Sequence, residues 1–326
     1  MERILFIVPN FMGYDCAIKK ALEKRGYIVD KYDDRPSNSF YAKAIIRVYK
    51  KMYSFYINNY YNDIWEKIKN NKYDIFLAVA IEAIPIWFIK KIRENNKNAY
   101  FVYYSWDSIF NKKGTNKFLP YFDKTFSFDR RDCENNSNIN FRPLFYLNEY
   151  YKIRHAKDFK YDLCIIGTAH SDRYSIIRKI INNIKDQNMS YFSYLYLNSR
   201  KLYFWLKITN SNFKHASISE FHYTTLKLSE IIYYISCSRI IIDIQHPKQT
   251  GLTMRTIEML GARRKLITTN ADIKMYDFYN PDNICIIDRN NPKIDIDFIN
   301  KEYVDPDNSI LYKYSIDGWL DDILNI

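Results

Sequence analysis

Residues 243–262, DIQHPKQTGLTMRTIEMLGA, form the stretch that points most directly to the fold. They continue an apolar, β-branched run, Arg239–Ile244, through a polar loop into a predicted helix over Met254–Leu260. A buried strand that leads through a short polar loop into a helix is typical of a parallel sheet covered by helices. The same alternation recurs along the chain, so the sequence predicts an α/β fold.

The alternation occurs as two successive series of predicted strands. The first series is Ile4–Val8, Tyr27–Tyr32, Asp74–Ala80, Ala99–Tyr104 and Lys124–Phe128, and the second is Tyr161–Ile166, Tyr191–Leu197, Arg239–Ile244, Lys265–Thr269 and Ile284–Ile287. We therefore predict two Rossmann-like domains, residues 1–150 and 151–326, each with a parallel sheet and helices on both faces. The polar run Asn148–Lys160 marks the boundary, and a closing helix, Ile316–Leu324, is free to pack back on the first domain.

Composition excludes several classes of protein. The 326 residues include only 7 glycines, none spaced for a G-x-G-x-x-G fingerprint or a P-loop. The 5 cysteines are scattered without a C-x-x-C, which argues against a disulfide framework or a zinc site. The first apolar run, Ile4–Val8, is too short for a signal peptide or a membrane span, so we expect a cytoplasmic protein.

The net charge of +12 is concentrated in the first part of the chain, where residues 1–150 hold 25 Lys and Arg against 17 Asp and Glu. Such an excess favours an anionic partner, such as a phosphate group, a nucleic acid or acidic lipid. The alternative is a composition rich in Lys, Asn, Ile and Tyr that reflects base usage in the gene. No nucleic-acid-binding motif is present, so nucleic acid is not the expected partner.

The loop after Ile244 carries most of the candidate ligand-binding residues, because ligands of open α/β sheets bind beyond the carboxyl ends of the strands. The backbone amides of the first helical turn, with Lys248 and Arg255, suit a phosphate group. Glu258 could accept hydrogen bonds from a ribose diol, or it could form an i, i+3 ion pair with Arg255. The residues predicted to bind a ligand here are Gln245, His246, Lys248, Gly251, Leu252, Thr253, Arg255, Thr256 and Glu258.

This strand, loop and Glu-bearing helix, followed by Gly261-Ala262-x-x-x-Leu-Ile-Thr-Thr-Asn270, resemble the donor-binding segment of GT-B glycosyltransferases. The closest resemblance is to CgeB-like and capsular or lipopolysaccharide biosynthesis proteins, and it is clearest over residues 160–290. It implies two Rossmann-like domains facing a cleft, a C-terminal domain that binds a nucleotide-sugar, and ribose binding by Glu258. Retaining members often carry a second Glu where this chain has Thr250, so retention of configuration is not supported.

A second loop, Gly167–Arg173, follows the first strand of the second series. Gly167 permits close approach of the backbone, and Thr168 and Arg173 could bind a diphosphate. This loop resembles the first loop of the C-terminal domain of the same family, where a basic residue often meets phosphate. The alternative is that Ser171 or Asp172 caps the next helix and that Arg173 lies in solvent.

The first domain is expected to bind the acceptor. Asp107, beside Trp106 at the end of a predicted strand, is the candidate general base that removes a proton from an acceptor hydroxyl. Its alternative role is an Asx-type cap of the following loop. Gly13 and its loop border the same side of the domain.

A predicted helix, Lys43–Tyr60, combines an apolar face that includes Phe55 and Tyr56 with a basic face. The basic residues are Lys43, Arg47, Lys50 and Lys51, and residues 41–60 contain no Asp or Glu. Such a helix can lie on anionic lipid, or it can pack its apolar face on the sheet with its cations in water. The D-x-D sequence Asp295–Asp297 is interpreted as part of a strand, and no metal is expected.

Together these features predict a cytoplasmic glycosyltransferase that can also lie peripherally on the inner face of the membrane. It would move a sugar from a nucleotide-sugar to a capsule, lipopolysaccharide or exopolysaccharide acceptor, without a metal or a cofactor. The alternatives are a nucleotide-sugar epimerase of the same fold, a non-catalytic polysaccharide assembly factor and a nucleic-acid-binding protein.

Overall fold

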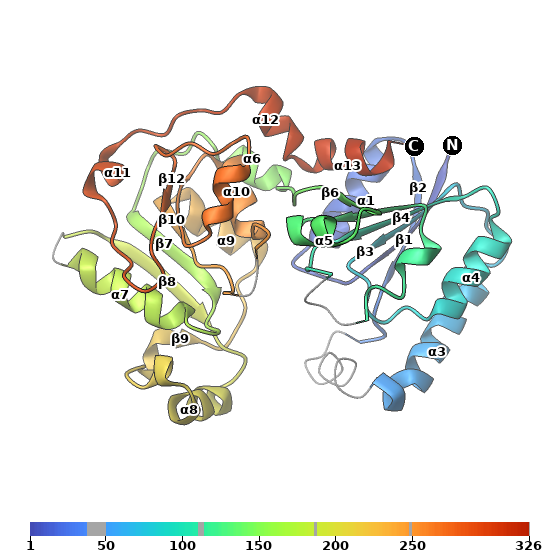
Figure 1. The fold of residues 1–326 in the computed structure, drawn as a ribbon, viewed down its shortest axis with the longest axis horizontal. Helices are drawn as coiled ribbons and strands as arrows, with labels where there is room; N and C mark the ends of the chain where they lie inside the picture. Colours follow the sequence, from blue (N-terminus) through green and yellow to red (C-terminus); the bar gives the residue numbers. More distant parts are fainter. Residues whose placement is uncertain (38–49, 110–113, 186–187, 248–249, 326) are drawn as a thin grey trace. The chain divides into compact units, whose positions relative to one another are not determined.

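The computed structural model describes residues 1–37, 50–109, 114–185, 188–247 and 250–325. The chain forms two compact units (Figure 1). The first comprises Met1–Pro143 and Ile316–Ile326, and the second comprises Leu144–Ser315.

The first unit contains a parallel sheet of six strands in the order β2-β1-β3-β4-β5-β6. Its strands are β1 (Arg3–Val8), β2 (Ile28–Asp33), β3 (Ile75–Val79), β4 (Tyr100–Ser105), β5 (Lys124–Ser127) and β6 (Ile139–Phe141). Leu5 and Ile7 pack with α3 and α4, whereas Ile4 and Phe6, which alternate with them, are buried on the other face. Burial on both faces explains why these strands are apolar without polar alternation.

The helices of the first unit are α1 (Tyr14–Lys24), α3 (Lys50–Ile68), α4 (Ile86–Asn95), α5 (Arg130–Asn135) and α13 (Ile316–Leu324). The closing helix α13 packs on the sheet of this unit. Trp319 is fully buried, and its ring meets Tyr104 of β4 edge-on with centroids 4.9 Å apart. Arg25, at the end of α1, donates to Asp321 at 2.7 Å. The last helix is therefore held by both apolar burial and charge.

The division after Pro143 lies earlier than the boundary that we expected after residue 150. Tyr146 and the short helix α6 (Asn148–Lys152) belong to the second unit. Tyr146 donates its backbone N–H to Tyr314 and its hydroxyl to Leu311. Its ring also lies over Gly261, where a Cβ atom would meet the ring at 2.5 Å. These contacts bind the polar connecting run to the second unit.

The second unit contains another parallel six-stranded sheet, in the order β12-β11-β10-β7-β8-β9. Its strands are β7 (Tyr161–Thr168), β8 (Tyr191–Tyr196), β9 (Phe221–His222), β10 (Ser238–Asp243), β11 (Lys265–Thr268) and β12 (Ile284–Ile286). Ile240 of β10 lies opposite Leu163 of β7 and Lys265 of β11. The two sheets confirm the predicted pair of Rossmann-like units, and they add two short strands, β6 and β9, that were not predicted.

The remaining helices of the second unit are α7 (Arg173–Lys185), α8 (Arg200–Thr209), α9 (Leu228–Ser236), α10 (Met254–Ala262), α11 (Ile296–Asn300) and α12 (Asn308–Lys313). The strand predicted across Asp295–Asp297 is wrong, because Ile296 begins helix α11. Asp295 caps that helix by accepting a hydrogen bond from the N–H of Asp297 at 3.0 Å. The carboxylate of Asp295 therefore caps the backbone of α11.

The predicted basic helix is described only from residue 50 onward. Lys43 and Arg47 lie outside the described residues, and so do the side chains of Lys50 and Lys51. Phe55 and Tyr56 of α3 are 68% and 60% exposed, so these two residues do not follow the alternative in which the apolar face packs on the sheet. The buried face of α3 is instead formed by Ile57, Tyr61, Ile64 and Ile68. None of the helices in the described ranges has the length and apolar character needed to span a bilayer.

Candidate functional site

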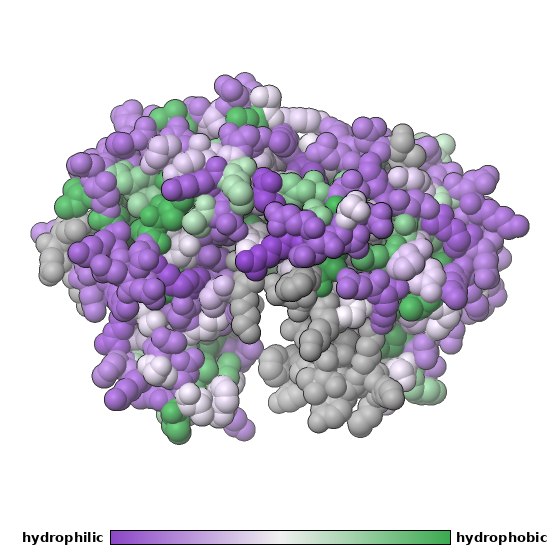
Figure 2. All heavy atoms as spheres, viewed as in Figure 1, coloured by the Kyte–Doolittle hydropathy of each residue, from purple (hydrophilic) through white to green (hydrophobic). Residues whose placement is uncertain are grey.

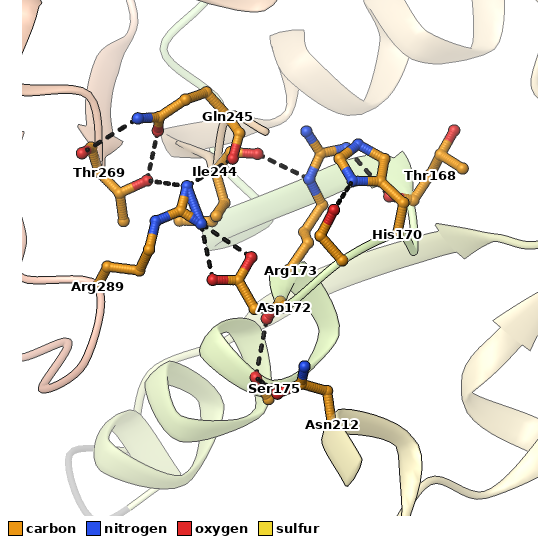
Figure 3. A network of polar contacts seen from close by, with 11 residues as sticks. Thr168, His170, Asp172, Arg173, Ser175, Asn212, Ile244, Gln245, Thr269 and Arg289 are labelled. Atoms are coloured by element: carbon orange, nitrogen blue, oxygen red, sulfur yellow. Dashed lines mark hydrogen bonds and ion pairs between the residues drawn. The ribbon is translucent and has the colours of Figure 1, made fainter. Parts of the chain in front are cut away.

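The candidate site of the second unit lies at the carboxyl ends of β7 and β10. These strands are neighbours, but the chain leaves β7 toward β8 on one side and leaves β10 toward β11 on the other. The point at which strand order reverses is where open α/β sheets bind ligands. Polar side chains from the loops after β7, β10, β11 and β12 gather there (Figure 3).

Arg173, the first residue of α7, lies across the reversal point. Its Nε donates to the carbonyl of Ile244 at 2.7 Å, and its Nη1 donates to the carbonyl of Thr168 at 3.0 Å. Its Nη2 makes no hydrogen bond to the described residues and points away from both carbonyls (Figure 3). Arg173 is thus held in place by neutral groups and keeps one donor available. The alternative of a free arginine in solvent is wrong.

Gly167 explains how the Arg173 side chain fits. A Cβ atom at residue 167 would lie 2.9 Å from Nη1 of Arg173, closer than atoms of this kind approach. The glycine therefore makes room for the guanidinium group beside the end of β7. Thr168 follows with its side chain exposed at the edge of the sheet.

Arg289 is a site residue that the sequence analysis missed. Its Nη1 lies 2.9 Å from both carboxylate oxygens of Asp172, and its Nη2 donates to the carbonyl of Gln245 at 2.6 Å. Arg289 follows β12, whose apolar run was predicted correctly. Its position just after the last predicted strand is the sequence signal that identifies it, because polar residues beyond strand ends form the sites of such sheets.

Gln245 and Thr269 join the ends of β10 and β11. The Thr269 hydroxyl donates to Oε1 of Gln245, and Gln245 Nε2 is 3.4 Å from the carbonyl of Thr269. Gln245 is buried, so its amide positions the loop. This leaves Gln245 little freedom to turn toward a ligand.

Two histidines border Arg173 at the same edge. The rings of His170 and His246 have centroids 5.4 Å apart, and Nδ1 of His170 is 3.2 Å from the Ser171 hydroxyl. Burial, the Arg173 charge and His246 together lower the pKa of His170 to about 4. His170 is therefore neutral at physiological pH and adds no charge to the site.

The start of helix α10 is tied to the end of β10. Thr253 caps the helix by accepting from the N–H of Thr256 at 3.2 Å. Both threonine hydroxyls donate to Asp243, that of Thr256 at 3.0 Å. Gly251 and Leu252 are buried just before the cap, and Lys248 lies outside the described residues. The cap confirms the predicted start of the helix and orients its first turn at the sheet edge.

Arg255 and Glu258 form the ion pair that was given as their alternative role. Nη1 of Arg255 is 2.9 Å from Oε2 of Glu258, and Glu258 is buried. Burial by itself lowers the pKa of Arg255, but the charges of Glu258, Tyr150 and Asp243 outweigh it and raise the pKa overall. Burial and then Glu258 raise the pKa of the Tyr150 hydroxyl. A ribose would thus meet a carboxylate that already has a cationic partner.

The three arginines of this region differ in one respect. Arg289 contacts Asp172 and Arg255 contacts Glu258, whereas Arg173 contacts backbone carbonyls but no carboxylate among the described residues. Burial lowers the pKa of Arg173, with Asp243 acting against this effect and the charges of Arg255 and Arg289 acting with it. Arg173 is therefore the cation of this edge best suited to an added anion.

The acceptor-side residues of the first unit also lie at a carboxyl edge. Gly13 caps α1 with a φ of 84°, and Met12 before it has a φ of 46°. This left-handed turn leaves Phe11 exposed, with its ring centroid 5.8 Å from that of Trp106. The two rings come from the loops after β1 and β4 and form an apolar surface at the edge of the sheet.

Asp107 is exposed beside this surface, and its carbonyl accepts from the Ser105 hydroxyl. The neighbouring carboxylate Asp132 is buried and accepts from the Ser108 hydroxyl at 3.2 Å and the N–H of Ile109 at 2.8 Å. Asp132 thus fixes the loop that carries Asp107. Across the described ranges, no three His, Cys, Asp or Glu side chains gather as a metal site would require.

Comparisons with known proteins identify the fold. No protein-family model and no curated protein sequence matches the chain. An α-glucosyltransferase solved with UDP and a mismatched 13-mer DNA matches with a TM-score of 0.60 at 14% identity, over 96% of this chain and 95% of that one. HepE from Anabaena, solved with UDP and glucose, matches with a TM-score of 0.57 at 9% identity over 100% of both chains.

A third solved structure with this fold is an epimerase. The UDP-GlcNAc 2-epimerase of Methanocaldococcus jannaschii matches with a TM-score of 0.52 at 8% identity, over 99% of this chain and 100% of that one. Matches at such low identity show the fold, which is the GT-B fold of two Rossmann-like units. They do not by themselves identify a reaction.

Proposed function

We propose that this protein is a glycosyltransferase that moves a sugar from a nucleoside diphosphate sugar to an acceptor hydroxyl. The observation that carries the proposal is Arg173, which spans the reversal point of the second sheet and has a free Nη2 donor. A pyrophosphate there would accept from Nη2 and from amides in the first turn of α10. Neutralising the leaving diphosphate in this way stabilises the transition state without requiring a metal.

The other donor contacts follow from the same edge. Thr168 and Thr253 lie within the loops that would border the phosphates, and Lys248 would add a second cation. For Glu258 to bind the ribose hydroxyls, it would share them with Arg255. We take UDP as the first nucleotide to test, because two of the similar structures were solved with it.

The acceptor is assigned to the first unit. An acceptor sugar would stack on the exposed ring of Phe11 and the half-buried ring of Trp106, and Asp107 would take the proton of its hydroxyl. The acceptor oxygen then bonds to the anomeric carbon as the bond from that carbon to the diphosphate breaks. Aromatic rings beside an exposed carboxylate suit a glycan, so we propose a capsule, lipopolysaccharide or exopolysaccharide acceptor.

Nucleic acid is the second candidate acceptor. The similar α-glucosyltransferase was solved with DNA, and residues 1–150 carry the larger share of the net charge of +12. Binding of duplex DNA would weaken steeply as salt is raised, because released counterions contribute to affinity. DNA binding that persists at 200 mM salt, with glucose transfer to DNA, would replace the glycan as acceptor.

A thermal-shift panel with UDP, GDP, CDP, CMP and ADP tests the donor assignment. One nucleotide should raise the melting temperature, and Arg173→Met should weaken its binding by roughly tenfold or more, because a charge-assisted hydrogen bond is lost. Arg178→Met is the matched control, since Arg178 lies in the same helix but donates to His215 and Tyr174. No shift at millimolar concentration, or equal effects of both variants, would contradict the proposal.

A donor-only reaction separates the proposal from the epimerase alternative. An epimerase of this fold would change the sugar of its nucleotide-sugar without any acceptor, which proton NMR of the sugar would detect. A glycosyltransferase leaves the sugar configuration unchanged until an acceptor is added. Nucleotide binding without either reaction would favour a non-catalytic assembly factor.

A further inference from the structure

We propose that α8 is a membrane-docking helix, whose exposed face binds the surface of a bilayer that contains anionic lipid. Helix α8 belongs to the second unit, and the hydrogen bonds that hold it involve none of the residues proposed to bind the nucleotide. It does not depend on the proposed reaction.

One side of α8 holds the helix on the unit. Tyr203 is buried, and its hydroxyl donates to the carbonyl of Ala216 at 2.9 Å. Lys207 lies on the same side, with its Nζ 3.1 Å from that carbonyl and 3.2 Å from the Tyr203 hydroxyl. Ser199 caps the helix by accepting from the N–H of Leu202. These contacts fix which residues face outward.

The opposite side of α8 is apolar and faces water. Phe204, Trp205 and Ile208 are 57%, 60% and 86% exposed. Their spacing of i, i+1 and i+4 places them on one stripe of the helix, and Lys201 falls on the same stripe. Figure 2 shows hydrophobic surface at the end of the second unit where Figure 1 places α8. Two large aromatic side chains beside an exposed Ile are costly in water and call for a partner.

The charged residues around this stripe indicate what kind of partner it binds. Residues 187–219 contain no Asp or Glu, but they contain Arg200, Lys201, Lys207 and Lys214. Lys201 and Lys214 are exposed and make no ion pair with the described residues. Aromatic and aliphatic side chains ringed by cations are what an interfacial helix presents to anionic headgroups. A ten-residue helix with one face packed on the unit can lie on such a surface but cannot cross it.

Vesicle co-sedimentation tests the proposal with the full-length protein. Vesicles of 70% phosphatidylcholine and 30% phosphatidylglycerol should bind the protein at 0.1 M salt, and vesicles of phosphatidylcholine alone should bind it less. The triple variant Phe204→Ser, Trp205→Ser, Ile208→Ser should lose binding by at least about tenfold, because the apolar area is removed. The matched control is Ile296→Ser with Val304→Ser, two aliphatic residues exposed elsewhere on the same unit.

A spectroscopic readout identifies the residue that enters the lipid. Brominated lipid should quench part of the tryptophan fluorescence, and Trp205→Phe should remove that part while vesicle binding persists. Unchanged quenching in Trp205→Phe, or equal vesicle binding by the triple variant, would overturn the proposal. A different result would also overturn it: the wild type does not bind anionic vesicles and self-associates in gel filtration, whereas the triple variant stays monomeric. That result would assign the exposed face of α8 to a second copy of the chain.

Discussion

At the scale of single residues, the site depends on how each charged side chain is paired. Arg173 is held by two carbonyls, whereas Arg255 and Glu258 neutralise each other. The sequence placed Arg255 and Glu258 on one helix face correctly, because positions i and i+3 share a face. It could not decide whether Glu258 faces a ligand or its neighbour. That choice depends on the burial of the pair beside Tyr150.

The Arg255–Glu258 pair gives the first residue-scale prediction. Glu258→Ala should lower the free energy of unfolding by roughly 3 kcal/mol, because it leaves the buried Arg255 charge without its carboxylate partner. The double variant Arg255→Met, Glu258→Leu removes both charges and should recover most of that loss. Urea unfolding measures the stability, and nucleotide binding is measured on the double variant. If the double variant binds nucleotide like the wild type, Glu258 has no ribose-binding role.

His170 gives a prediction on pH. Its pKa of about 4 in the folded protein lies below the unfolded value of 6.5, so the unfolded chain takes up the proton first as pH falls. Stability due to neutral His170 is complete above pH 6.5 and is lost between pH 6.5 and 4, by on the order of 1 kcal/mol after solvent screening. His170→Asn should flatten this part of the stability–pH curve. Parallel curves for the two proteins would contradict the prediction.

At the scale of elements, the junction of β10 and α10 shows how local sequence positions the site. Thr253 caps the helix, and Asp243 holds the hydroxyls of Thr253 and Thr256. The helix over Met254–Leu260 was predicted, whereas Thr253 was predicted to bind the donor and not to cap the helix. The hydrogen bonds from Thr253 and Thr256 to Asp243 were not predicted either, since they join a strand to a helix across a loop. These bonds aim the first turn of α10 at the sheet edge.

The cap can be tested by itself. Thr253→Ala should lower the free energy of unfolding by about 1 kcal/mol, because the N–H of Thr256 and the Asp243 carboxylate both lose a partner. Thr253→Ser keeps the hydroxyl and should remain within a few tenths of the wild-type value. Chemical unfolding of both variants provides the measurement. Equal losses would show that the methyl group of Thr253 matters rather than its hydroxyl.

At the scale of the whole molecule, the first unit contains residues from two separate parts of the chain. Helix α13 follows the second unit in sequence but packs on β4 through Trp319. The first unit therefore cannot reach its complete fold until the second unit has been synthesised. Stability of the first unit depends on residues at both ends of the chain.

Two tryptophans test this dependence. Trp319→Ala should destabilise the first unit by about 3–5 kcal/mol, because a fully buried side chain leaves a cavity. Trp205→Ala, at an exposed position, should change stability by less than about 0.5 kcal/mol. Calorimetry of Trp319→Ala should show a lower melting temperature for one of two unfolding transitions. Nucleotide binding to the second unit should persist. Loss of both transitions together would show that the units unfold as one.

The sequence by itself determined the two α/β series, most of the strands, the helix over Ile316–Leu324 and the loops that carry the site, because buried strands and capped helices leave patterns within a few residues. Only the tertiary structure decided that Arg173 bridges two strand ends, that Arg289 joins the site, that Glu258 is paired and that α8 exposes its aromatic face. These outcomes depend on contacts between residues far apart in the chain, whose energies no local pattern records.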